Sequence, residues 1–343
     1  MMLIRPATSA DLSSLFELAS KTGPGLTTFP ADMDILEEKI ESSIKSFNRD
    51  VKEPALEYYL FLLEDSETGK VVGTSALAAT VGLEHAFYTY HLGTVVHTSE
   101  ELNVHNVINA LYLGNDYTGT TEICTLFLDP DYRKNGNGQL LSRCRFLFMA
   151  MNQQRFAPNV IAEMRGVSDS DGNSPFWDAV GSHFFSMSFL DADGKSGEGQ
   201  NQFIAELMPK YPIYLPLLPK LARDVIGEVH PDTRPALNML EKEGFEYRGY
   251  VDIFDAGPTI EVQTKNIRSI KKSATYQVII EEDQQFDSSL STQYILGNQQ
   301  VVNFRSCYGQ AIIQQDNIII NKALANILEV DSGDNLRALA TGR

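Results

Sequence analysis

The stretch LDPDYRKNGNGQLLSRCRF, residues 128–146, carries the strongest signal for the fold of this chain. A run of apolar residues leads into it and is typical of a buried strand, and the residues at its end are typical of a helix. Residues 133–145 include four basic side chains and no acidic one, although the whole chain has a net charge of -17. The first N–H groups of a helix attract anions, and Gly136 and Gly138 let the backbone approach one closely. The order of strand, glycine loop and helix therefore predicts an anion-binding site.

The glycine loop has the pattern Arg133-x-x-Gly136-x-Gly138, with the charge of Lys134 beside it. It is not a Walker phosphate loop, because no Gly-Lys-Ser/Thr follows the glycines. It is not a dinucleotide GxGxxG loop either, because Leu141 stands in the third glycine position. The bare pattern would also fit a surface turn with a helix cap. The apolar strand before it and the basic helix after it favour the anion site.

The composition limits the classes of partner. Only 28 Lys and Arg stand against 45 Asp and Glu, which argues against nucleic acid as a partner. The acidic charge is compatible with a cationic substrate, but it is also common in proteins that bind none. No apolar run approaches the roughly 20 residues of a membrane helix, and the first residues do not resemble a signal peptide. Three cysteines without CxxC spacing argue against a disulfide scaffold or a zinc site and favour a cytoplasmic protein.

The order of predicted elements indicates a mixed α+β protein. A strand and a capped helix open the chain, residues 31–47 form a helix, and residues 56–80 form a hairpin. Residues 85–99 suggest a strand pair, whereas 101–114 fit helix or coil. Beyond the glycine loop, helix and strand alternate, and a further strand is expected at HFFSMSF (183–189).

The second half of the chain suggests a partial duplication. FWDAVGSHFF (176–185) and MLEKEGFEYR (239–248) both read as helix end, glycine and aromatic strand, with Gly181 and Gly244 as left-handed helix ends. Helix, glycine and strand follow one another in many proteins, so the similarity of these two segments can also arise without a duplication.

The predicted domains follow changes in composition. A proline-rich connector at 208–220 separates a first domain, 1–210, from a second segment, 211–270, that completes the same active site. Residues 274–343 are rich in Gln, Asn, Ile and Val and are expected to form a small β-rich subdomain.

The glycine loop resembles the acyl-CoA pyrophosphate loop of the GCN5-related N-acetyltransferase superfamily. IRPATSADL resembles that superfamily's opening, and TRPALNMLEKEGFEYRGY (233–250) resembles its second conserved block. In that block Thr233 and Leu240 depart from the usual Asn and Tyr. The blocks GKVVGTSAL, ELNVHN, AEMRGVSDSDGNSPFWDAVG, FIAELMPKYPIY, VIGEVHPDT and DIFDAGPT are similar, more specifically, to the bacterial arginine N-succinyltransferase family. This resemblance covers roughly residues 1–270.

The resemblance implies a GCN5-related mixed sheet flanked by helices and transfer of succinyl from succinyl-CoA to the α-amine of L-arginine, the first step of arginine catabolism to glutamate. It implies that Leu126, Arg133, Gly136 and Gly138 contact the acyl-CoA. It implies that His230 is the proton donor. No metal or membrane is implied, and the chain is expected to form a homo-oligomer or to pair with a paralogous chain.

Several alternatives remain open at the level of sequence. Tyr247 or Tyr250 could replace His230 as the proton donor, and a covalent route through Cys124 is conceivable but disfavoured in an apolar strand. The acceptor could be ornithine or another amine, or the chain could be a non-catalytic acyl-CoA-binding subunit. Charged residues that could hold the two substrates are Asp116, Glu163, Asp252 and Asp255 for the guanidinium, and Arg165 and Arg248 for the succinyl carboxylate.

Overall fold

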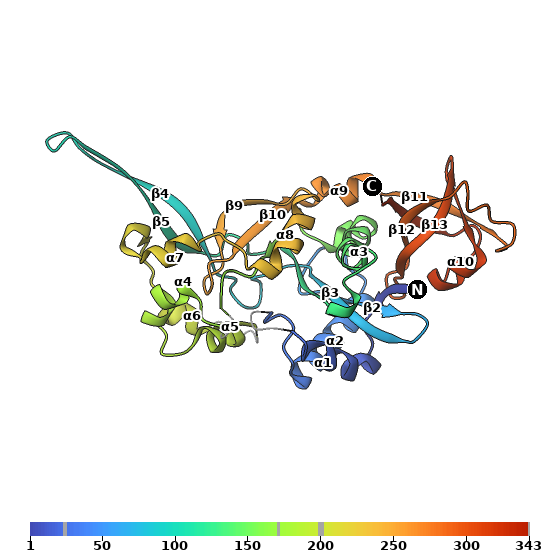
Figure 1. Cartoon of the computed structure of the whole chain (residues 1–343), viewed down its shortest axis with the longest axis horizontal. Helices are drawn as coiled ribbons and strands as arrows, with labels where there is room; N and C mark the ends of the chain where they lie inside the picture. Colours follow the sequence, from blue (N-terminus) through green and yellow to red (C-terminus); the bar gives the residue numbers. More distant parts are fainter. Residues whose placement is uncertain (23–25, 170–171, 198–201, 342–343) are drawn as a thin grey trace.

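The computed structural model describes residues 1–22, 26–169, 172–197 and 202–341. They form one continuous sheet of 15 strands with helices packed against it (Figure 1). The strands are β1 (Met2–Pro6), β2 (Tyr58–Asp65), β3 (Lys70–Ala78), β4 (Thr89–Ser99), β5 (Val104–Gly114), β6 (Thr121–Leu128), β7 (Asn159–Glu163), β8 (Ile213–Tyr214), β9 (Glu246–Val251), β10 (Pro258–Gln263), β11 (Ala274–Glu281), β12 (Thr292–Asn298), β13 (Ser306–Gln314), β14 (Asn317–Asn321) and β15 (Asn335–Ala340). The helices are α1 (Leu12–Ala19), α2 (Met33–Asn48), α3 (Asn137–Met151), α4 (Pro175–Ala179), α5 (Phe189–Gly197), α6 (Gln202–Leu207), α7 (Lys220–Asp224), α8 (Arg234–Glu241), α9 (Arg268–Lys272) and α10 (Lys322–Leu328).

The centre of the sheet contains a parallel pair of strands that separates along its length. Strands β1, β2, β3 and β6 are antiparallel neighbours, and so are β7, β10 and β9. The two groups join through β6 and β7, which run parallel and pair only at Thr121↔Val160 and Glu122↔Ile161. Parallel neighbours need a crossover connection, and α3 provides it. Beyond the two pairs the strands diverge, and this opening positions the site described below.

The crossover helix α3 is buried around most of its circumference. Eleven of its fifteen residues are buried. It packs against β1 and β3 of the central sheet and against β12 of the C-terminal strands. Contact on two sides explains why its residues are apolar on nearly every face and why its sequence carries only a weak helical periodicity.

The long hairpin of β4 and β5 projects far from the rest of the molecule (Figure 1). Eleven residue pairs join the two strands, from Thr89↔Gly114 to Ser99↔Val104. The prediction of helix or coil for 101–114 is therefore wrong. Apolar and polar residues do not alternate regularly along the hairpin, because most of its length packs on no other described element.

The C-terminal strands continue the central sheet. Strand β13 pairs with β1 at Leu3↔Cys307 and Ile4↔Ser306, and β11 to β15 with α10 enclose a separate apolar cluster. The β-rich character predicted for 274–343 and the mixed α+β class are confirmed. Residues 299–305 form the turn that leads into β13.

The predicted duplication holds only in part. Gly244 has the left-handed φ of 102° expected at a helix end, but Gly181 is not among the residues with positive φ. At Gly181 a Cβ would lie 2.1 Å from the Trp177 ring, so close packing explains this glycine. The strand expected at 183–189 is also absent from the described residues there, where a 3-10 turn (Gly181–His183) is followed by α5.

No helix among the described residues is long and apolar enough to cross a membrane.

Candidate active site

A cavity of about 350 Å³ lies where β6 and β7 separate. Residues of β6 from Glu122 to Phe127 line one wall, and residues of β7 and the segment after it, Ala162 to Arg165, line another. Leu26, Thr27 and Thr28, between α1 and α2, also contribute. The cavity is therefore built from the edges of two strands whose hydrogen-bonding groups no longer face each other.

A β-bulge marks the β6 wall of this cavity. Thr125 has a left-handed φ of 55°, and the register with β3 jumps from Ala76↔Cys124 to Thr74↔Phe127. Neither Thr125 nor Leu126 has a partner in this register. A bulge re-aims backbone groups, so the N–H and C=O of Leu126 are the polar groups this residue can offer to a ligand. Its side chain packs against the core.

The predicted glycine loop leads from β6 into α3. Gly136 is the N-cap of α3 with a φ of 79°, a conformation that favours glycine. A Cβ at Gly136 would lie 2.8 Å from the hydroxyl oxygen of Tyr308, and that hydroxyl donates to the Gly136 carbonyl at 3.0 Å. Gly138 is less constrained, since the nearest atom to an added Cβ is at 3.9 Å. Arg133 lines the cavity and its Nε donates to the Leu128 carbonyl at 3.1 Å.

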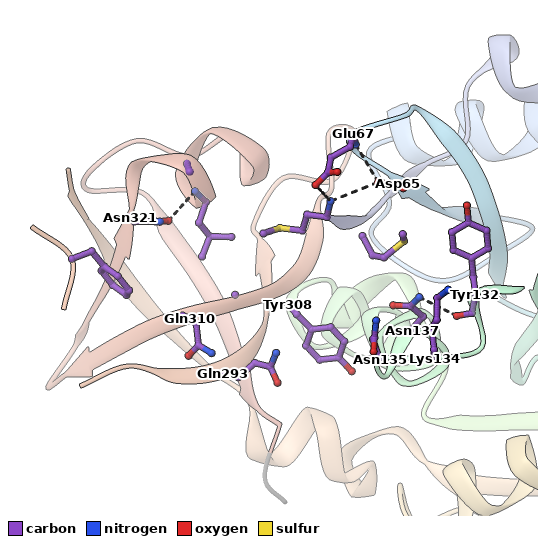
Figure 2. Close-up of a pocket in the computed structure, with 16 residues that line it drawn as sticks. Asp65, Glu67, Tyr132, Lys134, Asn135, Asn137, Gln293, Tyr308, Gln310 and Asn321 are labelled. Atoms are coloured by element: carbon purple, nitrogen blue, oxygen red, sulfur yellow. Dashed lines mark hydrogen bonds and ion pairs between the residues drawn. The ribbon is translucent and has the colours of Figure 1, made fainter. Parts of the chain in front are cut away.

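A second cavity, of about 710 Å³, borders the same loop on the side of the C-terminal strands (Figure 2). Lys134, Asn135 and Asn137 of the loop line it together with Tyr308. The Asn137 amide donates to the Tyr132 carbonyl at 3.0 Å and so holds the loop closed. Tyr308 is a functional candidate that sequence reasoning missed, because only the tertiary fold brings β13 to the loop.

His230 stands beside the first cavity, at the start of a 3-10 turn (Pro231–Thr233) that leads into α8. Its backbone N–H donates to the Arg165 carbonyl at 2.9 Å, and the next residues, Asp232 and Thr233, line the cavity. Its Nδ1 accepts the N–H of Asp232 at 3.2 Å, which leaves Nε2 to carry the proton. Partial burial, together with the nearby charge of Arg165, lowers the pKa of His230.

Besides Asp232, five carboxyl groups line the cavity: Glu122, Glu163, Asp193, Asp252 and Asp255. In the described part of the chain, no Lys or Arg nitrogen lies within 4.0 Å of any of them. Burial raises the pKa of each, and repulsion between neighbours raises it further for Glu163, Asp193 and Asp255. A site that concentrates unpaired carboxyl groups in this way favours a cation.

Backbone N–H groups fix the positions of two of these carboxyl groups. Asp255 is buried and accepts the N–H groups of Gly166 at 2.6 Å and Gly257 at 2.8 Å. Asp252 accepts the N–H of Phe254 at 2.7 Å. Three of the five acids were candidates from sequence. Asp116 was a candidate too, but it lies away from the cavity and accepts the Tyr250 hydroxyl at 2.8 Å.

Three guanidinium groups line the cavity, those of Arg133, Arg145 and Arg165. Arg165 donates to the Ser168 hydroxyl at 2.9 Å, and its Nε is buried without a partner. The other arginine proposed from sequence, Arg248, pairs with Glu246 and Glu261 outside the cavity. Sequence reasoning counted Arg145 among the basic residues of the predicted anion-binding stretch but did not name it as a site residue, because its burial in the cavity wall depends on the tertiary fold.

The surroundings of the alternative nucleophile, Cys124, and of the alternative acids, Tyr247 and Tyr250, are less suited to these roles. Burial raises the pKa of the Cys124 thiol to about 12, so a thiolate is disfavoured. The Tyr250 hydroxyl donates to Asp116, its pKa is raised to about 12, and burial raises the pKa of Tyr247 as well. Among the described residues, no three His, Cys, Asp or Glu side chains are grouped so that they could hold a metal ion.

The separated parallel strands, the bulge in β6 and the glycine loop that begins α3 together define an acyltransferase of the GCN5-related type. The chain belongs to the arginine N-succinyltransferase beta subunit family, whose model matches residues 2–269. The model of that family's C-terminal domain matches residues 284–340.

Individual relatives agree with this assignment. The chain is 48% identical over 337 residues to the arginine N-succinyltransferase of Escherichia coli O139:H28, covering 98% of this chain and 97% of the relative. It has the same identity and coverage with the enzyme of that name from Shigella flexneri. The solved structure of arginine/ornithine succinyltransferase subunit AI from Pseudomonas aeruginosa superposes with a TM-score of 0.90 at 37% identity, covering 100% of this chain and 99% of that chain. The resemblance found in the sequence is thereby confirmed.

Proposed function

We propose that this chain transfers the succinyl group of succinyl-CoA to the α-amine of L-arginine, giving N2-succinyl-L-arginine and CoA, as the first step of arginine catabolism. The observation that carries the proposal is the cavity between β6 and β7, where the glycine loop before α3 and a bulged strand meet a group of carboxyl groups without a cationic partner. Family membership supports the same reaction.

The acyl-CoA is proposed to dock through the loop before α3. Its pyrophosphate would meet the N–H groups of the first turn of α3, where Gly136 and Gly138 leave room for it. Arg133 adds a positive charge at the edge of the cavity. The backbone of Leu126 would then hold the acyl carbonyl, because the bulge leaves its polar groups without a registered strand partner.

His230 is proposed to supply the proton to the leaving thiolate. In direct transfer, the neutral amine attacks the thioester carbonyl, the C–S bond breaks, and the sulfur must be protonated while the amine loses a proton. The Nε2 proton of His230 is the one free to be delivered, because Nδ1 accepts a backbone N–H.

The acceptor is proposed to bind with its guanidinium among the carboxyl groups of the cavity. This preference would also admit ornithine, which is cationic and is named with arginine for the Pseudomonas aeruginosa subunit. The test is thiol release from succinyl-CoA with arginine, ornithine, lysine or buffer alone, with acetyl-CoA in parallel. Arginine-dependent release with succinyl-CoA is expected. No release with any pair would leave an acyl-CoA-binding subunit as the remaining function.

The acidic wall predicts that arginine binding strengthens with pH. Burial raises the pKa of Glu122 to about 7 and that of Asp255 to about 8, and the pKa values of Glu163, Asp193 and Asp252 are raised as well, so the wall gains negative charge as the pH rises through neutrality. The guanidinium stays charged throughout. The KM for arginine should therefore fall between about pH 6 and pH 9. The KM for succinyl-CoA, measured in the same series, is the control. A KM for arginine that is flat or rises over this range would contradict the proposed acceptor site.

The domain division is proposed with one catalytic unit in two segments. Residues 1–210 provide β6, β7 and the loop, and residues 211–270 provide His230, Asp252 and Asp255. Residues 274–343 form the β-rich unit that supports the loop through Tyr308. The three cysteines are free thiols, which supports a reducing cytoplasm as the location.

We also propose that the chain associates with a second copy, or with a paralogous chain, through the β4–β5 hairpin. Val96 and Val107 are paired across the two strands and are 53% and 61% exposed, and Leu102 at the tip is 72% exposed. Replacing both valines with lysine should reduce the size of the particle measured by light scattering while the protein stays folded. An unchanged size would assign the contact to another surface, and lysine in place of the exposed Leu221 serves as the control.

A further inference from the structure

Arg145 is a buried charge that no carboxylate balances. It lies on α3, it is 1% exposed, and it lines the cavity between β6 and β7. Its donors reach only neutral groups: the Ser142 carbonyl at 3.1 Å, the Ser142 hydroxyl at 3.2 Å and the Cys124 carbonyl at 3.4 Å. No carboxylate of the described chain lies within ion-pair distance, and burial lowers its pKa. A buried guanidinium in this condition is costly unless a negative charge is present when the protein works.

The other two guanidinium groups of the cavity have different surroundings. Arg133 is exposed at the glycine loop, where the proposed function places a pyrophosphate. Arg165 lies close enough to Asp193, Asp232 and Asp255 for their charges to act on it. Arg145 alone among the three therefore combines burial in the cavity wall with the lack of a nearby carboxylate.

The position of Arg145 relative to β6 indicates what it would meet. Its Nη1 donates to the carbonyl of Cys124, the residue before the bulge. The bulge at Thr125 and Leu126 is where the proposed function places the thioester carbonyl. A group attached to that carbonyl and reaching toward Cys124 would approach Arg145.

We propose that Arg145 binds the terminal carboxylate of the acyl group, and so determines the preference for a dicarboxylic acyl donor over a neutral one. The inference rests on the proposed function for the identity of the donor. The carboxylate would provide the missing counter-charge, in a charge-assisted hydrogen bond sheltered from water. A neutral acyl chain of equal length would leave the guanidinium unpaired, and the site would reject it for that reason.

The test compares succinyl-CoA with butyryl-CoA, which has a methyl group in place of the carboxylate. In Arg145→Met, kcat/KM for succinyl-CoA should fall about 30-fold, as expected for the loss of a hydrogen bond to a charged group. The value for butyryl-CoA should be unchanged or higher. The ratio of the two donors is the readout, because a general loss of structure would lower both values together.

Arg155→Met is the matched control. Arg155 is also buried, at 6% exposure, and also donates to neutral groups, the carbonyls of Ser46 and Arg49 and the hydroxyl of Tyr59, but it does not line the cavity. Its loss should lower thermal stability without changing the donor ratio. If Arg145→Met changes the ratio of kcat/KM for the two donors no more than Arg155→Met does, the role of Arg145 is only structural and the proposal is overturned.

Two further measurements keep the proposal testable. Should the methionine variant not fold, Arg145→Lys retains the charge and is expected to lower the donor ratio only about tenfold or less, since lysine lacks the bidentate fork. An Arg145→Lys enzyme in which both donors lose activity equally would count against the proposal.

In the wild-type protein without acceptor, succinyl-CoA should raise the melting temperature more than butyryl-CoA does. Equal stabilisation would overturn the carboxylate site even if arginine-dependent succinyl transfer is observed, so the two proposals can fail separately.

Discussion

His230→Ala should lower kcat by about 100-fold or more, the usual effect of removing a general acid. The imidazole stands at the edge of the cavity with Nδ1 on the Asp232 N–H, which leaves the Nε2 proton free to be delivered. The KM for succinyl-CoA should change little, because the proposed docking loop lies elsewhere on the chain. Steady-state kinetics with arginine as the acceptor would measure both.

His183→Ala is the control for the loss of a histidine. His183 is exposed and lies in the 3-10 turn before α5, away from the lining of the cavity. Wild-type turnover in His230→Ala would remove this residue from the chemistry. Tyr247→Phe and Tyr250→Phe would then be the next variants to make, although neither tyrosine lines the cavity.

Gly136→Asp should raise the KM for succinyl-CoA on the order of 100-fold. A carboxylate about 4 Å from the pyrophosphate is strongly repelled even at an intermediate dielectric constant. The substitution also places a Cβ on a residue with a φ of 79° and 2.8 Å from the Tyr308 hydroxyl. The loop would have to shift, and the N–H groups of α3 would lose their alignment with the phosphates. Calorimetry with CoA would measure the loss of binding directly.

Gly136→Ala separates the two causes of this effect. It introduces the same Cβ and the same backbone strain without the charge, so it should weaken CoA binding less than the aspartate does. Gly333→Asp is the control for a charged side chain on a left-handed glycine in open space, in the turn before β15. CoA binding at wild-type strength in Gly136→Asp would contradict the proposal that this loop binds the pyrophosphate.

The parts of the site that are continuous in sequence could be predicted from it. The strand–loop–helix unit around Gly136 was recognisable because a helix N-terminus, glycines and basic residues follow one another along the chain. His230 was placed through its motif. Three acids of the cavity were also named as candidates, but nothing in the sequence distinguished them from Asp116, which lies elsewhere.

Segments whose structure depends on tertiary packing were the main failures. The hairpin strand β5 was not predicted because a projecting hairpin buries little of either face, so the alternation that signals a strand is weak. The supposed strand at 183–189 failed because its aromatic residues fill a cluster around Trp177. That packing depends on neighbours distant in the chain, and it overrides local preference.

The sequence by itself determined the class of fold, the glycine loop before α3 and the family, because each of these depends on residues that are contiguous in the chain. Only the tertiary structure decided which charges meet. Asp193, Asp252 and Glu163 converge on the strand edges from separate elements, and Tyr308 reaches the loop from the far end of the chain. Arg145 is the clearest case. In the sequence it is one basic residue of a helix, whereas burial on both sides of α3 makes it an unbalanced charge in the wall of the cavity. Burial and pairing are properties of the assembled fold, so no local pattern could have shown them.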